Sequence, residues 1–161
     1  MSMAENGNTE RPAAPAGQTI SVISQYVKDF SFESPGAPQS LRSRTSMPAI
    51  AINVNVTPRP AQGDEIEVEL RIDANAREGE TTVFAIELVY GGLFRLINIP
   101  KENALAVAMI ECPRLLFPFA RQIISDASRN GGFPPLLIDP IDFMALYRQR
   151  AQAAAARTAN A

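Results

Sequence analysis

The chain has 161 residues, 46% of them hydrophobic, so it can bury one sizeable core and is too short for two average domains. Its formal charge of −2 and its pI near 5.2 argue against a nucleic-acid partner, because binding phosphates needs a basic surface. The single cysteine excludes an internal disulfide and is typical of a reducing compartment.

The first 18 residues are polar and rich in Pro, Ala and Gly, without periodicity, and we predict a disordered tail over 1–18. This segment has neither the basic start nor the apolar centre of a signal peptide. No run of about 18 apolar residues stands out as a membrane span. We therefore expect a cytoplasmic protein with no direct membrane insertion.

Alternating apolar and polar residues predict four β-strands. In the first, which ends at Glu33, the pattern places Tyr26, Phe30 and Phe32 on one face and acidic residues on the other. The polar run from Ser34 to Pro48 is too long for a hairpin turn, so it predicts a crossover loop.

Three further strands, over 50–57, 66–73 and 82–94, are joined by short turns with Pro, Gly and Asp, as in antiparallel hairpins. Gly91-Gly92 near the end of the last strand predicts a bulge or the close approach of another segment.

Three helices are expected after the strands. The first, from Pro100 to Cys112, is apolar almost all round and is predicted to be buried. The second is amphipathic, has Pro118 in its first turn and ends at Asn130-Gly131-Gly132. After a proline-rich connector, Asp139 is predicted to cap a last helix from about Pro140 to past Arg150, followed by a flexible Ala-rich tail over 151–161.

Strands in one block and helices in another predict an α+β fold. We expect a four-stranded antiparallel sheet, with a crossover loop after strand 1 and helices packed on one face, in a single domain over 19–150. The apolar helix surface exceeds what one small sheet can cover. The sequence therefore favours an oligomer with helices between the sheets of different subunits.

The residue types argue against an enzyme and against a metal or cofactor site. There is no histidine, so imidazole-based catalysis is excluded and a zinc site would need carboxylates and one thiol. Cys112 is better explained as a small buried hydrophobe than as a reactive thiol. Gly91-Gly92 lacks the lysine and the spacing of a phosphate-binding loop.

Four sequence blocks stand out in order along the chain: KDFSFESPGAP at 28–38, YGGLF at 90–94, CPRLLFPFAR at 112–121 and SRNGGFPPLLIDPIDFMALY at 128–147. Together they resemble the SecB family of bacterial protein-export chaperones, and the resemblance covers roughly Tyr26 to Arg148. It implies a homotetramer, a dimer of dimers. It also implies an ATP-independent chaperone that binds unfolded precursor proteins, keeps them translocation-competent and delivers them to the SecA ATPase.

The resemblance also assigns roles to residues. Asp29, Glu33 and Glu87 fall where SecB docks SecA, and Ala85 stands where some relatives carry a larger apolar contact. Without the resemblance, such acids would be explained as a solvated face that keeps the sheet soluble.

Two apolar sets complete the expected sites. A groove for unfolded clients is expected at residues of the crossover loop, the connector and the last helix, namely Leu41, Met47, Phe133, Leu137, Phe143, Leu146 and Tyr147. An oligomer interface is expected at the inward face of the fourth strand and on the amphipathic helix, namely Ile86, Leu88, Tyr90, Leu116, Phe119 and Ile123. The alternative is an oligomeric scaffold whose acidic sheet face binds a basic protein without any client groove.

Overall fold

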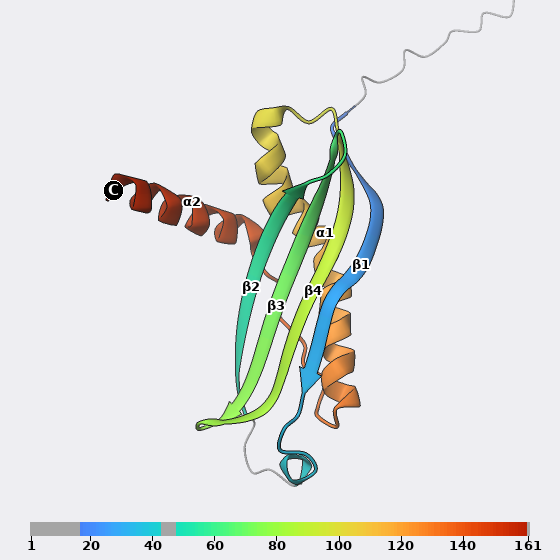
Figure 1. The fold of residues 1–161 in the computed structure, drawn as a ribbon, viewed down its shortest axis with the longest axis vertical. Helices are drawn as coiled ribbons and strands as arrows, with labels where there is room; N and C mark the ends of the chain where they lie inside the picture. The colour runs from blue at the N-terminus through green and yellow to red at the C-terminus, as the bar shows by residue number, and fades with distance from the viewer. Residues whose placement is uncertain (1–16, 43–47, 161) are drawn as a thin grey trace, which may run out of the picture.

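A computed structural model describes residues 17–42 and 48–160, and within these ranges the chain forms four long strands and two long helices (Figure 1). The strands are β1 (Thr19–Glu33), β2 (Ala49–Pro60), β3 (Glu65–Glu78) and β4 (Thr81–Ile97); the helices are α1 (Lys101–Asn130) and α2 (Phe143–Ala159), with a short 3-10 helix η1 (Gln39–Leu41). The predicted α+β fold is confirmed. The segment 1–16 of the predicted N-terminal tail lies outside the described residues.

The strands form one antiparallel sheet in the order β1-β4-β3-β2. Tight turns join β2 to β3 and β3 to β4, and Gly63 and Gly79 take positive φ values of 60° and 59° there, which glycine adopts without a Cβ clash. The chain from β1 to β2 connects opposite edges of the sheet, as the length of the crossover loop predicted (Figure 1).

One face of the sheet, here called the inner face, packs against α1. Val68, Leu70 and Ile72 of β3 and Ile86 and Leu88 of β4 are all 0% exposed. Leu116, Ala120 and Ile124 of α1 are likewise 0% exposed. The opposite face, here called the outer face, carries the alternate polar residues of the same strands, so the period-two pattern reports correctly which side is buried.

β1 contains two register shifts against β4, between Val22 and Ser24 and between Val27 and Asp29. An extra residue in a strand moves the following side chains to the other face. Tyr26 therefore lies on the outer face, where its hydroxyl donates to Glu67, and not beside Phe30 and Phe32 as predicted. The bulges therefore lie in β1 and not at Gly91-Gly92 of β4, where one was predicted.

Gly91 and Gly92 each leave room for a neighbouring side chain. A Cβ on Gly91 would lie 2.6 Å from a ring atom of Tyr26 on the outer face. A Cβ on Gly92 would lie 2.6 Å from the Phe94 ring and 2.8 Å from Leu116 of α1 on the inner face. Of the two explanations offered for this pair, close approach is the one that the structure supports.

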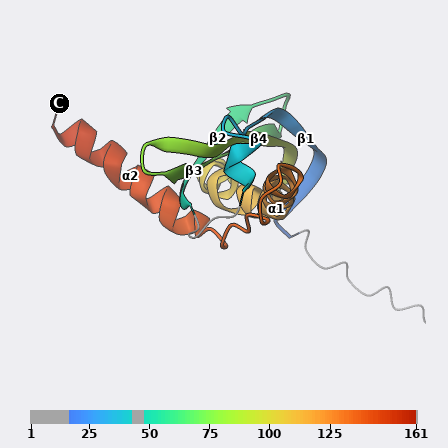
Figure 2. The same ribbon diagram turned by 90° about the horizontal axis from the view of Figure 1, so that it is seen from below.

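The two helices predicted over 100–112 and 116–129 form one helix, α1, with Pro113 and Pro118 inside it. Each proline removes one backbone donor, a cost that packing of the apolar face can offset, and internal prolines bend helices. The two halves of α1 are visibly offset in Figure 2. By length and composition α1 could cross a membrane, a test that core helices also pass, and its buried residues pack on the sheet.

The end of α1 and the start of α2 are both well defined. α1 ends at Asn130, and Gly132 takes the positive φ of 90° that the Gly-Gly pair predicted. α2 begins later than predicted, because the Asp142 carboxylate, and not Asp139, caps it by accepting from the Ala145 N–H at 3.0 Å.

α2 runs past Arg150, as predicted, but it continues to Ala159, so residues 151–159, predicted to be a flexible tail, are helical. Alanine has the highest intrinsic helix propensity, so the Ala-rich segment continues the helix. Only the first residue of α2, Phe143, is buried, and the helix extends away from the sheet (Figures 1 and 2).

Candidate functional site

The outer face brings the predicted docking residues together on two adjacent strands. In the register between β1 and β4, Glu33 pairs with Ala85, Ser31 with Glu87 and Asp29 with Val89, and all of these residues lie on the outer face. We call Asp29, Glu33 and Glu87, together with Ala85, the acidic patch. All three carboxylate residues are exposed.

The guanidinium of Arg71 lies against the acidic patch. Arg71 of β3 lies 3.2 Å from Asp73 and 3.8 Å from Glu87, and its charge also acts on Asp29. Asp73 pairs with Glu87 across β3 and β4, so it extends the patch by a carboxylate that the resemblance did not indicate. The carboxylates of Asp29, Asp73 and Glu87 therefore interact with one guanidinium, and among the described residues Asp29 and Glu33 take part in no ion pair.

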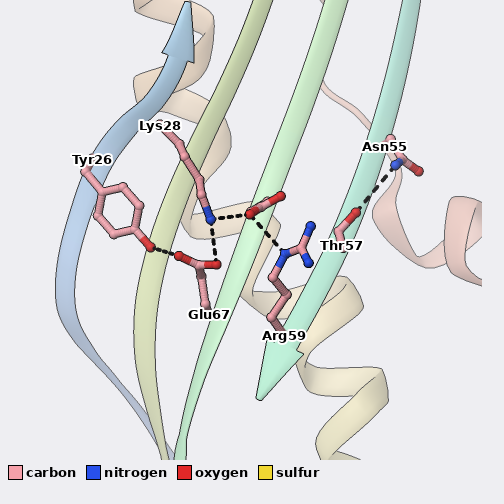
Figure 3. A network of polar contacts seen from close by, with 7 residues as sticks. Tyr26, Lys28, Asn55, Thr57, Arg59 and Glu67 are labelled. Atoms are coloured by element: carbon pink, nitrogen blue, oxygen red, sulfur yellow. Dashed lines mark hydrogen bonds and ion pairs between the residues drawn. The ribbon is translucent and has the colours of Figure 1, made fainter. Parts of the chain in front are cut away.

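A second cluster of polar residues lies on the same outer face, and its members bond to one another (Figure 3). Lys28 Nζ lies 2.9 Å from Glu67 Oε1 and 2.5 Å from Glu69 Oε1, Arg59 Nε lies 3.1 Å from Glu69 Oε1, and the Tyr26 hydroxyl donates to Glu67. We call these five residues the Lys28 network. Two cations and two carboxylates cancel within it.

The electrostatics of the Lys28 network follow from these contacts. The hydrogen bond from Tyr26, then that from Lys28, lowers the pKa of Glu67, and the hydrogen bond from Lys28 lowers the pKa of Glu69. The pKa of Tyr26 is raised to about 12, first by burial and then by its bond to the Glu67 carboxylate. At neutral pH Glu67 and Glu69 are therefore ionised and Tyr26 is protonated.

The predicted groove residues divide into exposed and core positions. Leu41 and Leu137 are 43% and 58% exposed, and Leu146 and Tyr147 are half-buried. Phe133 and Phe143 instead belong to the core of the subunit. Phe133 packs on Phe84 at 4.8 Å between ring centroids, Phe143 is 1% exposed, and neither offers surface to a client here. Met47 lies outside the described residues.

Two hollows on the surface combine predicted site residues with apolar residues that the sequence did not single out, such as Leu105 and Met109. One of about 440 Å³ lies between β1 and the end of α1, lined by Phe30, Phe32 and Ile123 among others. The other, of about 400 Å³, lies between β2, α1 and α2, with Leu105, Met109 and Tyr147 in its wall. Leu105 is 54% exposed, although its apolar surroundings in the sequence predicted burial.

Arg150 attaches the middle of α2 to the edge strand β2. Its guanidinium donates to the Val56 carbonyl at 2.9 Å and contacts the Asn55 side chain. The second hollow is thereby bounded by α2 on one side and by the sheet on the other.

The six predicted interface residues are not equivalent in the single subunit. Ile86, Leu88 and Leu116 are 0% exposed and Tyr90 is 8% exposed, so they form the subunit core and present almost no surface to another copy in this conformation. Ile123 is half-buried. Phe119 is 52% exposed, with its ring stacked on Tyr90 at 6.3 Å between centroids.

Exposed apolar residues of β1 lie on the same side as Phe119. Val27 and Phe30 are 50% and 42% exposed although the register places both on the inner face. The alternation in β1 could have indicated Phe30, but the bulge at Lys28 hides the position of Val27 from a period-two pattern.

Cys112 is buried in α1, and burial raises the pKa of its thiol to about 12. A thiol in this state is not a nucleophile at neutral pH. The ranges 17–42 and 48–160 contain no group of three or more acidic, histidine or cysteine residues arranged to hold a metal ion.

The chain matches known proteins over most of its length. The family model described as "Preprotein translocase subunit SecB" matches residues 13–154. The "Protein-export protein SecB" of Xanthobacter autotrophicus is 55% identical over 148 residues, which are 92% of this chain and 93% of the relative. The protein of the same name from Rhodopseudomonas palustris strain HaA2 is 52% identical over 149 residues, 92% and 94% of the two chains.

A solved structure supports the fold. The SecB-like chaperone Rv1957 of Mycobacterium tuberculosis, in complex with a ChAD peptide from the HigA1 antitoxin, superposes with a TM-score of 0.58 over 76% of this chain and 90% of that one. The identity is 15%, so this likeness concerns the fold.

Proposed function

Because the chain belongs to the SecB family of protein-export proteins, we propose that it is an ATP-independent cytoplasmic chaperone. In this function it binds unfolded precursor proteins, keeps them translocation-competent and delivers them to the SecA ATPase. The observation that carries the proposal is the division of the sheet into an acidic outer face and an inner side with exposed apolar residues.

Client binding would use the exposed apolar residues around α2 and the crossover loop. Leu41, Leu137 and Tyr147 keep accessible surface, and the hollow beside Tyr147 adds Leu105 and Met109. Covering apolar surface contributes about 25 cal/mol per Å², whatever the client sequence. Flexible methionine and leucine side chains can adapt to many partners, so this surface suits promiscuous binding.

Self-association would cover another part of the apolar surface. Val27 and Phe30 on the edge strand β1 and Phe119 on α1 are half exposed, and contiguous exposed apolar surface of this kind marks interfaces. A dimer of dimers with α1 between sheets would bury them. This arrangement is the one that the family resemblance implies.

SecA docking would use the acidic patch. A surface with four carboxylates and one base attracts a basic partner and accelerates encounter. Ala85, which pairs with Glu33 and lies two residues from Glu87 on β4, is half-buried and small, so a partner can approach the backbone closely there.

Client binding is tested by the aggregation of an unfolded precursor at stoichiometric amounts of the protein, without ATP. Delayed aggregation, together with binding of the unfolded but not the folded precursor, is the expected result. Leu41→Ser/Leu137→Ser/Tyr147→Ser should weaken binding while circular dichroism stays unchanged. A protein that binds SecA but leaves aggregation unaffected would be the scaffold alternative.

SecA docking is tested by calorimetric titration of the protein with SecA at low and high salt. Glu33→Lys/Glu87→Lys should abolish SecA binding and leave client binding intact. The matched control is Asp64→Lys/Glu65→Lys, the same change of charge beside Arg95 at the opposite end of the sheet. Equal loss in both variants would mean that net charge, and not the acidic patch, governs docking.

A further inference from the structure

The bulge at Lys28 places a cation directly beside the acidic patch. Lys28 is the bulged residue and pairs with no residue of β4. Its side chain and that of Asp29 both point to the outer face. Lysine carries its charge on a flexible four-carbon stem, so its ammonium can reach several neighbours. Unless held elsewhere, Lys28 would neutralise Asp29.

The ammonium of Lys28 is held on its other side. It bonds Glu67 at 2.9 Å and Glu69 at 2.5 Å, and these carboxylates are themselves fixed by Tyr26 and Arg59. The side chains of Glu67 and Glu69 are only 20% and 12% exposed. The charges of the Lys28 network are therefore paired within the subunit, and its two carboxylates offer little surface to a partner.

The other cation that faces Asp29 is restrained in the same way. Arg71 Nε bonds Asp73 at 3.2 Å, and its other end lies 3.8 Å from Glu87. Both cations near Asp29 are thus engaged with carboxylates of β3 or β4, and Asp29 stays without an ion pair among the described residues.

We infer that Glu67 and Glu69 are positioning residues for partner docking: by holding Lys28 away from Asp29, they keep the acidic patch open to a basic partner that they do not touch. This inference rests on the proposed function, since it concerns the same patch. It predicts that substituting two carboxylates outside the acidic patch weakens docking, because the released Lys28 then pairs with Asp29.

The test uses the full chain and three variants. Glu67→Gln/Glu69→Gln should weaken SecA binding about two- to five-fold at low salt, the size of one exposed ion pair, and by less at high salt. Adding Lys28→Gln should restore wild-type affinity. The variant Glu67→Gln/Glu69→Gln frees Lys28 and Arg59, of which only Lys28 is adjacent to Asp29. Asp64→Asn/Glu65→Gln also removes two carboxylates and frees Arg95 at the opposite end of the sheet, and it should leave affinity unchanged.

A readout without any partner separates this inference from the proposed function. Hydrogen bonds to Glu69 and then Glu67 raise the pKa of Lys28 in the wild type, and NMR of its side-chain nitrogen can follow it. In Glu67→Gln/Glu69→Gln the pKa should fall only in part, because Asp29 replaces one of the two lost carboxylates, and it should fall further when Asp29→Asn is added.

Each outcome decides a different question. If adding Asp29→Asn to Glu67→Gln/Glu69→Gln does not lower the pKa of Lys28 further, the ammonium does not turn to Asp29 and the inference is wrong. If Lys28→Gln fails to restore SecA binding, the inference is also overturned. Absence of SecA binding by the wild type would refute the proposed docking, while the NMR titration would still test the role of Glu67 and Glu69.

Discussion

Gly92 offers a test of the close packing between the sheet and α1. In Gly92→Ala the new Cβ would lie 2.6 Å from the Phe94 ring and 2.8 Å from Leu116, and both neighbours are 0% exposed. Overpacking a filled core costs about 1–3 kcal/mol, whereas replacing glycine by alanine gains about 0.4–1 kcal/mol through the unfolded chain. The clash should win, with a net destabilisation of about 1–2 kcal/mol.

Thermal and urea unfolding at fixed protein concentration measure this effect, since assembly makes stability depend on concentration. We expect the melting temperature of Gly92→Ala to fall by about 2–6 °C. Gly91→Ala is the matched control, because the half-buried Tyr26 can swing outward at the cost of its bond to Glu67. Equal stability of Gly92→Ala and wild type would refute the reasoning, as would equal losses in the two variants.

A double-mutant cycle locates the strain. Leu116→Ala alone should cost about 2–5 kcal/mol by opening a cavity. Combined with Gly92→Ala, the total should be less than additive, because the truncated side chain no longer meets the new Cβ. Strict additivity would show that Leu116 does not contribute to the clash.

Three further predictions follow from buried or paired groups. The Leu136 N–H donates to Ser128 Oγ at 2.8 Å, so Ser128→Ala should reduce stability by about 1–2 kcal/mol and speed amide exchange at Leu136. Ser125→Ala is the control, because it keeps the backbone carbonyl to which Ser128 donates and should leave this exchange unchanged. Phe119→Asp should lower the mass seen by light scattering and keep the subunit folded, but Ile86→Asp should unfold it, because an unpaired buried carboxylate costs several kcal/mol; an unchanged mass for Phe119→Asp would place the interface elsewhere. The lowered pKa values of Glu67 and Glu69 mean that their stabilisation is present at neutral pH and lost as the pH falls below the ordinary value of 4.5, so the melting temperatures of wild type and Glu67→Gln/Glu69→Gln should converge on acidification; a constant difference would contradict this.

The strands were predictable because one face of the sheet is buried. Val68, Leu70 and Ile72 alternate with polar residues, and such alternation has only one register that buries them all. The bulge at Lys28 was not predictable in this way. An inserted residue changes no local composition, so Tyr26 was placed on the wrong face and the Lys28 network was missed.

The helices show the limit of local rules about proline. Pro113 and Pro118 suggested a break, yet both lie within α1. The segment between them includes the fully buried Leu116, and burial of α1 on the sheet outweighs two missing backbone donors. Such packing depends on residues of the sheet that are distant in sequence, so the residues around the two prolines do not predict it.

The acidic patch was indicated by the sequence, but its state of charge was not. Asp29, Glu33 and Glu87 belong to strands whose pairing places them together, which the alternation and the resemblance both suggested. Which acids are already neutralised depends on contacts between residues 39–41 positions apart, such as those of Lys28 with Glu67 and Glu69. The folded structure is therefore needed to tell the unpaired acids, Asp29 and Glu33, from the paired ones, Glu67 and Glu69.

The two faces of the sheet also limit how far the two proposed activities can influence each other. Glu33 and Glu87 project from the outer face, whereas Phe32 and Ile86 beside them in the register pack on the inner face, with the hydrogen-bonded backbone between. Exposed charges are screened beyond about 8–10 Å at physiological ionic strength. A charge reversal in the acidic patch should therefore leave client affinity unchanged at physiological salt. A modest electrostatic effect at low salt would be long-range, whereas an effect that persists at high salt would require contact between the patch and the client.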